Sequence, residues 1–181
     1  MFEKISYEQW VKDFKTHVDP TSFLNDNYIK QLYDEIKLPT RGSEFSAGHD
    51  FYIPYMYTLN PNKNIILTGI RWNTELDTES TLDAVGSILC NKVLLLFARS
   101  STAKKYGFAL MNKVGVVDMD YYKADNEGHI MLLVDVKSAT SEYTLNQGDK
   151  IAQGVILPYY VEAGTELVGK ERTGGFGSTG K

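Results

Sequence analysis

The sequence predicts an all-β barrel or double sheet, preceded by a pair of helices. Beyond Pro39, short apolar or β-branched runs alternate with turn residues, and no helical period intervenes. These runs cover residues 51–53, 65–70, 93–97, 114–117, 130–136 and 151–157. Many short strands of this kind are typical of barrels and sandwiches. A chain of 181 residues is long enough for one such core and too short for two ordinary domains.

Helical spacing is confined to the first 38 residues. Ser6 and Gln9 have the spacing of a capping box, and apolar residues follow at i, i+3, i+4 and i+7. A second helical pattern begins after a cap at Asn25 or Asp26 and stops at Pro39. Its aromatic stripe indicates packing surface rather than a ligand site. A protein partner that docks on these helices is a further possibility.

Composition excludes several classes of function. The net charge is -4 and no Lys/Arg run occurs, which argues against a nucleic-acid groove. The single cysteine, Cys90, excludes an internal disulfide and a cysteine-rich zinc site, and it is typical of a reducing compartment. The N-terminus lacks the pattern of a signal peptide, and no apolar run approaches the roughly 20 residues that span a bilayer. We therefore expect a cytoplasmic protein without a membrane partner.

Residues 112–121 form a β-branched run that carries two acids. In an extended chain, Val114, Val116, Asp118 and Asp120 share one face, so Asp118 follows two core-like valines. A carboxylate at the mouth of an apolar strand is partly desolvated, which suits it to take a proton from water. The alternative is that the two acids begin a hairpin turn.

Two other strands end in, or contain, polar groups suited to anions. Arg99 follows the run at residues 93–97 and offers a planar fork of donors, which Ser100 and Ser101 can complete as an anion cradle. Gln153 interrupts an apolar strand, so its amide is either satisfied in the core or directed to a ligand. Asp149, just before this strand, is expected to fix a turn.

A glycine-rich tail at residues 174–180 would by default be a disordered terminus. Two features argue for a role in binding. Phe176 supplies a flat face that can stack on a base, and Ser178 and Thr179 supply donors for phosphates beside it.

Five stretches in a fixed order together resemble the five motifs of the homotrimeric dUTPases. They are residues 46–50, 98–103, 115–121, 148–153 and 172–180. The resemblance implies a distorted jelly-roll barrel of the dUTPase type. The domains implied are a helical extension at residues 1–38, a β domain at residues 39–170, and a flexible tail at residues 171–181 that closes over the site.

The resemblance also implies an activity, namely hydrolysis of dUTP to dUMP and diphosphate with Mg²⁺. Asp118 would be the catalytic residue that activates water for attack on the α-phosphate. Asp50 would contact the metal through water, as an outer-sphere carboxylate. The enzyme would be a homotrimer whose sites draw motifs from neighbouring subunits.

The remaining motif positions would bind the substrate. The triphosphate would be bound by Arg99, Ser100, Ser101, Gln153 and Arg172. The nucleoside would be bound by Asn112, Gly115, Val117, Tyr121 and Phe176, and the tail would add contacts from Gly177, Ser178 and Thr179. In the family, Tyr121 packs beneath the deoxyribose and leaves no room for a 2'-hydroxyl, while Asn112 and the main chain of the hairpin read the uracil edge.

The sequence departs from the family pattern at two places. Residues 122–129 exceed the family's short turn and are expected to reshape the rim of the base pocket or a subunit contact. Thr173 alone separates Arg172 from the paired glycines, one residue fewer than the family pattern.

One rival is a dCTP deaminase of the same fold, which residues 118–121 and the tail disfavour. The other is a regulatory binding protein that docks a partner through its helices or its loops at residues 73–92 and 122–129.

Overall fold

The computed structural model describes residues 1–61, 64–75, 91–136 and 143–159. Its helices are α1 (Tyr7–His17), α2 (Asp26–Asp34) and α3 (Ser100–Tyr106), and a 3-10 turn, η2, covers Tyr121–Lys123. The first strands are β1 (Phe2–Lys4), β2 (Thr40–Arg41), β3 (Gly48–Tyr52), β4 (Tyr57–Leu59), β5 (Asn64–Leu67) and β6 (Ile70–Trp72). The later strands are β7 (Asn91–Ala98), β8 (Phe108–Leu110), β9 (Gly115–Val117), β10 (Met131–Val136), β11 (Tyr143–Leu145) and β12 (Lys150–Tyr159).

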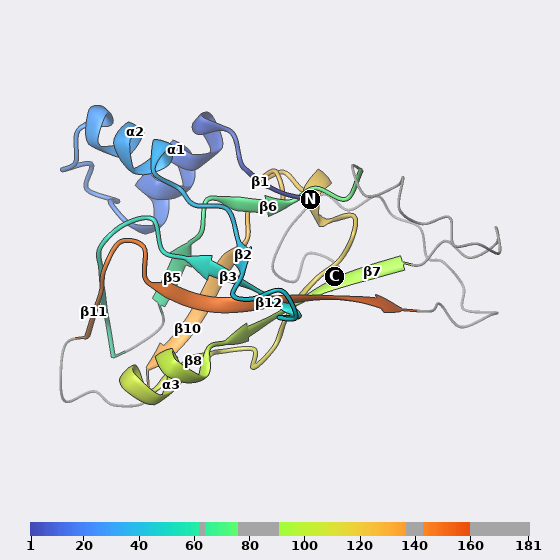
Figure 1. The fold of residues 1–181 in the computed structure, drawn as a ribbon. Coiled ribbons are helices and arrows are strands. Elements are labelled where there is room, and N and C mark those ends of the chain that lie inside the picture. Colours follow the sequence, from blue (N-terminus) through green and yellow to red (C-terminus); the bar gives the residue numbers. More distant parts are fainter. Residues whose placement is uncertain (62–63, 76–90, 137–142, 160–181) are drawn as a thin grey trace, which may run out of the picture.

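The largest sheet has five strands in the order β2-β3-β12-β7-β9, and every pair in it is antiparallel. The long strands β12 and β7 lie side by side at its centre (Figure 1). Gln153 of β12 stands opposite Asp50 on one side and Phe97 on the other. This register brings together three stretches that the sequence places far apart.

A second sheet has the order β5-β10-β8, and the ribbons β1-β6 and β11-β4 complete the described strands. These strands form separate sheets and do not close into one hydrogen-bonded barrel. The all-β prediction is confirmed, because each predicted run coincides with a strand. The run at residues 65–70 is divided into β5 and β6, since Gly69 turns the chain with a φ of +70°.

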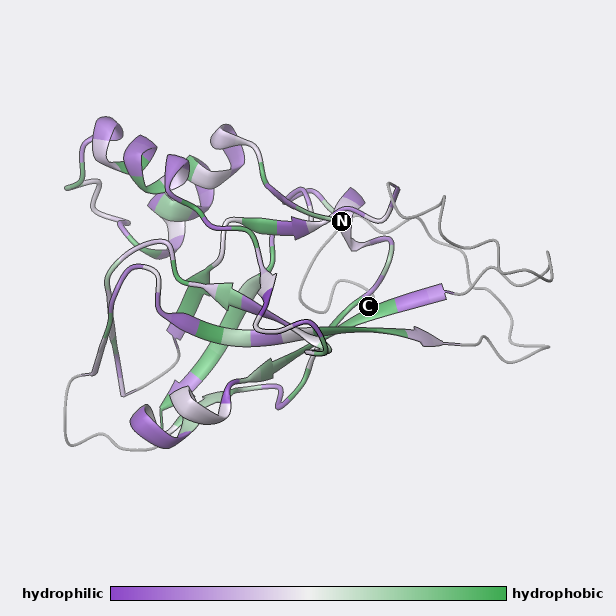
Figure 2. Cartoon of the chain, viewed as in Figure 1, coloured by the Kyte–Doolittle hydropathy of each residue, from purple (hydrophilic) through white to green (hydrophobic). Residues whose placement is uncertain are grey.

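The N-terminal helices belong to the same hydrophobic core as the strands. Trp10 and Phe14 of α1 are 0% and 1% exposed, and Ile29 of α2 is also buried. The Phe14 ring packs edge-on against Tyr55, with centroids 5.5 Å apart. Figure 1 shows both helices together on one side of the strands, and Figure 2 shows β5 and β10 largely in hydrophobic colours. The domain boundaries near residues 38 and 170 stay predictions.

The first residues also form a strand that helical spacing did not predict. β1 pairs with β6 in antiparallel register, with Phe2 opposite Trp72. A short helix, α3, follows β7 although no helix was expected beyond Pro39, because its seven residues are too few to reveal a period. No helix in the described part of the chain is long and apolar enough to cross a membrane.

The helix caps are partly as predicted. The Ser6 hydroxyl accepts a hydrogen bond from the Gln9 N–H at 3.1 Å, and the Asn25 side chain accepts one from the Tyr28 N–H at 2.8 Å. The reciprocal half of the capping box is wrong. The Gln9 amide donates to Asp13 instead, and the Ser6 N–H donates to a carboxylate from a distant loop.

Candidate functional site

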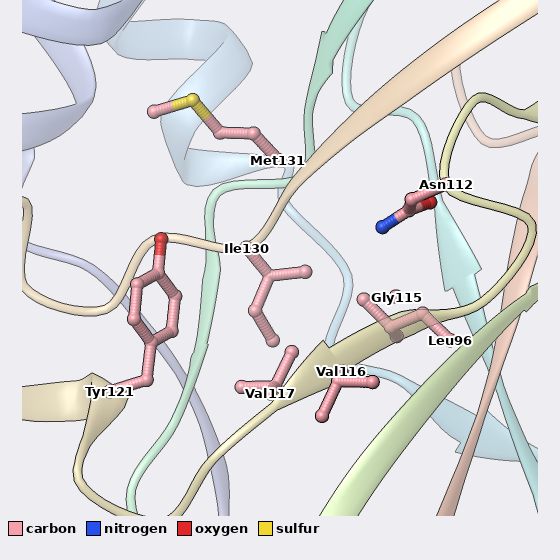
Figure 3. Close-up of a pocket in the computed structure, with 8 residues that line it drawn as sticks. All are labelled: Leu96, Asn112, Gly115, Val116, Val117, Tyr121, Ile130 and Met131. Atoms are coloured by element: carbon pink, nitrogen blue, oxygen red, sulfur yellow. The ribbon is translucent and has the colours of Figure 1, made fainter. Parts of the chain in front are cut away.

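A pocket of about 110 Å³ lies between β9 and the segment around residues 121–131 (Figure 3). This volume is several times the roughly 15 Å³ that a single water needs. The residues that line it are Leu96, Asn112, Gly115, Val116, Val117, Tyr121, Ile130 and Met131. Asn112, Gly115, Val117 and Tyr121 were all predicted to bind substrate, so the fold brings these predicted residues together. Figure 3 shows Tyr121 and Asn112 on opposite sides, with Ile130 and Val117 between them.

The faces of β9 are the reverse of those expected. Gly115 and Val117 are buried, whereas Val116 is 59% exposed, so the expectation that Val114 and Val116 line the core is wrong. The reason lies in the pairing with β7. Gly115 and Val117 stand opposite Leu96 and Leu94, which are both buried, and directly opposite residues share one face of a sheet.

Gly115 also allows β9 to approach β7 closely. A Cβ atom at this position would lie 3.1 Å from the Leu96 side chain. Any larger residue would therefore push against the wall of the pocket that Leu96 forms.

Asp118 directly follows β9 and is exposed in the single chain. The expected desolvation by core-like valines is therefore wrong for this chain alone. The Asp118 carbonyl accepts a hydrogen bond from the Tyr121 N–H at 3.2 Å, and the Asp120 carbonyl accepts one from Lys123 at 3.1 Å. Both acids thus begin a turn, in part as the alternative interpretation proposed, but the turn does not close a hairpin, because β9 pairs with β7 whereas the next strand, β10, pairs with β5 and β8.

Tyr121 is held firmly in the pocket wall. Its side chain is only 7% exposed. The hydroxyl donates to the His129 carbonyl at 3.0 Å and accepts from the Asn126 amide at 3.0 Å. Because both lie beyond η2 in the same loop, this loop fixes the orientation of the ring.

A cluster of charges lies near the other end of β7. Asp50 is 4% exposed and lies between two cations. The Arg99 Nε is 2.9 Å from its Oδ1, and the Lys150 Nζ is 2.8 Å from its Oδ2. The Arg99 contact is an ion pair without hydrogen-bond alignment, so Oδ1 accepts no directed hydrogen bond from any described residue. One acceptor oxygen of a buried carboxylate therefore keeps its capacity for a further donor.

A second pocket, of about 310 Å³, opens beside this cluster. Its lining consists of Arg99, Ser101, Thr102, Lys105, Leu145, Gly148, Asp149 and Lys150. Three cationic side chains against one carboxylate favour an anionic ligand. Arg99 and Ser101 meet here as predicted, whereas the exposed Ser100 is not part of the lining.

Asp149 fixes a turn, as predicted, because its Oδ2 accepts a hydrogen bond from the Asn146 N–H at 2.8 Å. Gln153 is half-buried, and its side chain lies across Gly48. A Cβ atom at Gly48 would come within 2.2 Å of the Gln153 amide nitrogen. Gln153 lines neither of the two pockets, although it stands directly opposite Asp50 in the sheet.

One chain does not bring Asp118 and Arg99 to a common pocket. Val117 stands opposite Leu94, so Asp118 lies level with Val93, which precedes Arg99 by six residues. At about 3.3 Å per residue, the separation along β7 is about 20 Å. The predicted tail residues Arg172, Phe176, Gly177, Ser178 and Thr179 lie outside the described residues.

Sequence reasoning missed several residues of both pockets. Lys150 was not singled out, because its contact with Asp50 depends on the pairing of β12 with β3. Ile130 and Met131 close the first pocket from the start of β10, and the sequence does not reveal where this strand lies relative to β9. Leu96 could have been predicted as a buried wall residue, since it lies within the apolar run at residues 93–97.

Comparisons with known proteins agree with one another. Residues 34–180 match the family model described as dUTPase. A deoxyuridine 5'-triphosphate nucleotidohydrolase of Lactococcus lactis is 36% identical over 149 residues, which cover 80% of this chain and 89% of that protein. A protein of the same name from Desulfitobacterium hafniense is 41% identical over 151 residues, covering 80% and 87%.

Solved structures give the same result for the fold. The crystal structure of dUTPase from Streptococcus mutans superposes with a TM-score of 0.60 and 26% identity, covering 90% of this chain and 98% of that one. A mutant dUTPase from phage phi11 of S. aureus, described with a structural Mg(II) ion, has a TM-score of 0.53 and 18% identity, covering 75% of this chain and 92% of that one.

Proposed function

Because this chain belongs to the dUTPase family, we propose that it hydrolyses dUTP to dUMP and diphosphate in a magnesium-dependent reaction. The observation that carries this proposal is the pocket between β9 and Tyr121. It gathers Asn112, Gly115, Val117 and Tyr121 around one space in a single chain.

The nucleoside binds in this pocket. The Asn112 amide and main-chain groups of β9 pair with the uracil edge, and cytosine is rejected because donors would face donors. The Tyr121 ring packs beneath the deoxyribose. Its two hydroxyl hydrogen bonds support this role, since a ring that cannot swing aside leaves no space for a 2'-hydroxyl.

The triphosphate extends to the cationic pocket around Arg99 and Ser101. A guanidinium and two ammonium groups neutralise phosphate oxygens there. Two residues outside the lining also contact the phosphates in this proposal: Gln153, which stands opposite Asp50 in the sheet, and Ser100, which precedes Ser101. The tail residues Arg172, Phe176, Gly177, Ser178 and Thr179 close over the nucleotide, with Phe176 against the uracil.

Asp118 supplies the base. Its carboxylate orients a water molecule and takes a proton from it as the water oxygen bonds to the α-phosphorus. The bond from this phosphorus to the bridging oxygen breaks, and the electron pair leaves with diphosphate. A positioned general base of this kind accelerates proton transfer by about 10²–10⁴ fold.

The residues around Asp50 fit a magnesium ion held through water. Asp50 offers one buried oxygen without a directed hydrogen bond, which suits a metal-bound water as donor. No group of three or more His, Cys, Asp or Glu gathers among the residues that the structure describes, so a direct protein cage is not the arrangement proposed. When bound, Mg²⁺ supplies charge neutralisation on the triphosphate. Arg99 and Lys150 hold the Asp50 carboxylate in place for this contact.

We propose a homotrimer, with Asp118 and Arg99 of one site drawn from different subunits. The separation of about 20 Å along β7 supports this arrangement, because a single triphosphate cannot meet both residues of one chain. Val116, Leu157 and Tyr159 of the large sheet are 59%, 43% and 40% exposed, and they offer apolar surface for a second copy.

The test measures diphosphate release from dUTP, dCTP, dTTP and UTP with Mg²⁺ and with EDTA, together with ammonia release from dCTP. We expect diphosphate from dUTP alone, and only with Mg²⁺. Ammonia from dCTP would instead support the deaminase of the same fold. Release of neither diphosphate nor ammonia would contradict the enzymatic proposal.

A further inference from the structure

A buried polar network ties the loop after Tyr121 to helix α1. His129 is 0% exposed, and its Nε2 accepts a hydrogen bond from the Gly69 N–H at 2.9 Å. Nδ1 therefore carries the proton and donates to the Asp13 carboxylate of α1 at 2.7 Å. The Gln9 amide, one turn earlier on α1, donates to the same carboxylate oxygen at 2.9 Å.

A second link joins the same loop to the first residue before α1. The two oxygens of the Glu127 carboxylate accept hydrogen bonds from the Ser6 N–H at 2.7 Å and from the Ser6 hydroxyl at 2.6 Å. Glu127 has a φ of +58°, a left-handed conformation that glycine would adopt freely and that strains other residues. The two hydrogen bonds to Ser6 offset this strain. Glycine at this position would relieve the strain but could not form these hydrogen bonds.

The loop held in this way is the one that fixes the pocket. Both partners of the Tyr121 hydroxyl, the Asn126 amide and the His129 carbonyl, lie within it. Ile130 and Met131 follow directly and line the pocket with Tyr121. Movement of residues 126–129 would therefore carry the Tyr121 ring and the adjoining wall with it.

We infer that helix α1 positions Tyr121 in the nucleotide pocket, and that Ser6, Asp13, Glu127 and His129 are positioning residues for discrimination against ribonucleotides. The inference rests on the proposed function, in which the ring of Tyr121 excludes the 2'-hydroxyl. Ser6 and Asp13 lie before residue 34, where the family match begins, so this support is added to the family's pocket by another part of the chain. The same contacts give the long turn at residues 122–129 a role as the connection between helix and pocket.

The experiment compares Glu127→Ala and Glu127→Gly with the wild type. Both substitutions remove the link to Ser6, but only glycine also relieves the left-handed strain. We expect the ratio of kcat/KM for dUTP over UTP to fall about tenfold in both variants, the usual effect of losing a charge-assisted hydrogen-bond pair. Most of the change should be a rise in kcat/KM for UTP, because a less restrained ring admits the 2'-hydroxyl, while kcat for dUTP should stay within about twofold. Hydrogen exchange of the amides at residues 121–130 should become faster.

Lys15→Ala is the matched control. Lys15 also lies on α1, and its ion pair with Asp26, at 2.9 Å, is exposed and does not touch the loop. This variant should keep the wild-type ratio and the wild-type exchange.

The outcomes separate the inference from the proposed function. A wild type that does not cleave dUTP would contradict the proposed function itself. A wild type that cleaves dUTP, with Glu127 variants that keep the dUTP over UTP ratio or the exchange rates, would overturn the inference. A fall in the ratio for alanine but not for glycine would also overturn it, because the effect would then follow stability and not the link to Ser6.

Discussion

The two pockets differ in how much of each is built by a single chain. The pocket proposed for uracil, here called the enclosed side, has a fixed wall, since Tyr121 is buried and hydrogen-bonded from a loop that α1 holds through His129. The pocket proposed for the phosphates, here called the open side, is charged, with Arg99 and Lys150 around the Asp50 carboxylate. Asp118, which the proposed reaction needs beside the phosphates, lies exposed about 20 Å from Arg99.

This contrast indicates that folding of one chain completes the first pocket, whereas assembly of subunits is needed to complete the proposed catalytic centre. The proposed substrate selection depends on groups that folding alone brings into contact, and such groups are preorganised before the ligand arrives. The proposed catalysis depends on groups that only a second subunit can bring together. Substitutions in the two pockets should therefore affect stability, KM and kcat to different extents.

The largest effect is expected for Asp118→Asn. The amide keeps the shape of the side chain but cannot take a proton from water, so kcat should fall by about 10²–10⁴ fold. Titration calorimetry with dUTP should show binding within about threefold of the wild type, because the enclosed pocket is untouched. Asp120→Asn, two residues later, is the control and should stay active. An unchanged kcat in Asp118→Asn would remove this residue from the mechanism.

The enclosed side should be sensitive to the packing of α1. Phe14→Ala removes a fully buried ring and should lower the free energy of unfolding by about 3–5 kcal/mol in urea denaturation. Phe23→Ala is the matched control, since Phe23 is 88% exposed, and its effect should be within about 0.5 kcal/mol. Equal losses in the two variants would show that α1 does not stabilise the fold through its core face.

On the open side, Lys150→Met removes one of the two cations beside Asp50. We expect KM for dUTP to rise about tenfold, since a charged hydrogen bond contributes about 1.5–3 kcal/mol. The free energy of unfolding should change little by comparison, because the Lys150 side chain is 40% exposed. Lys12→Met on the exposed face of α1 should leave KM unchanged. A lower KM in Lys150→Met would contradict the assignment of phosphates to this pocket.

The smallest effect concerns pH and the network around His129. Burial lowers the pKa of His129, and the hydrogen bond to Asp13 opposes this only in part. The unfolded histidine therefore binds protons first, and stability that is complete above pH 6.5 should fall as the pH drops through that value. The slope from one such group is at most about 1.4 kcal/mol per pH unit.

Urea unfolding at pH 7.5 and pH 5.5 would measure this slope. His129→Gln should reduce it, because glutamine keeps an acceptor for Gly69 and a donor for Asp13 without titrating. For Asp13, burial raises the pKa but hydrogen bonds from His129 and Gln9 outweigh it, so its contribution is lost only below about pH 3.8.

Two further groups, His17 and Glu127, influence His129 through their charge. His17→Gln is the comparison and should change the slope less than His129→Gln, because His17 influences His129 only through its charge. His49, whose pKa burial also lowers, contributes with the same sign, so His129→Gln should reduce the slope without abolishing it. An unchanged slope would mean that His129 does not titrate in this range.

Local patterns predicted the elements well. Short apolar and β-branched runs predicted the main strands, and the caps at Ser6 and Asn25 follow from short-range hydrogen bonding that the sequence displays directly. The motif residues of β9 and Tyr121 were predicted to share a site, and they line one pocket.

Long-range pairing accounts for what sequence reasoning could not predict. The orientation of β9 is set by Leu94 and Leu96 across the sheet, and periodicity alone cannot choose between the two faces of a strand. The partner of the Ser6 N–H is Glu127, 121 residues away, and no local rule anticipates such a contact. Lys150 reaches Asp50 only because β12 pairs with β3.

The distance between Asp118 and Arg99 along β7 predicts complementation between inactive variants. If one active centre takes these residues from different copies, a mixed oligomer of two inactive variants contains some centres in which both residues are intact. A mixture of Asp118→Asn and Arg99→Ala chains, unfolded and refolded together, should regain activity in about a quarter of its centres, the fraction that chance gives both intact residues. Each parent refolded alone should stay inactive, as would the mixture if every centre were built within one copy.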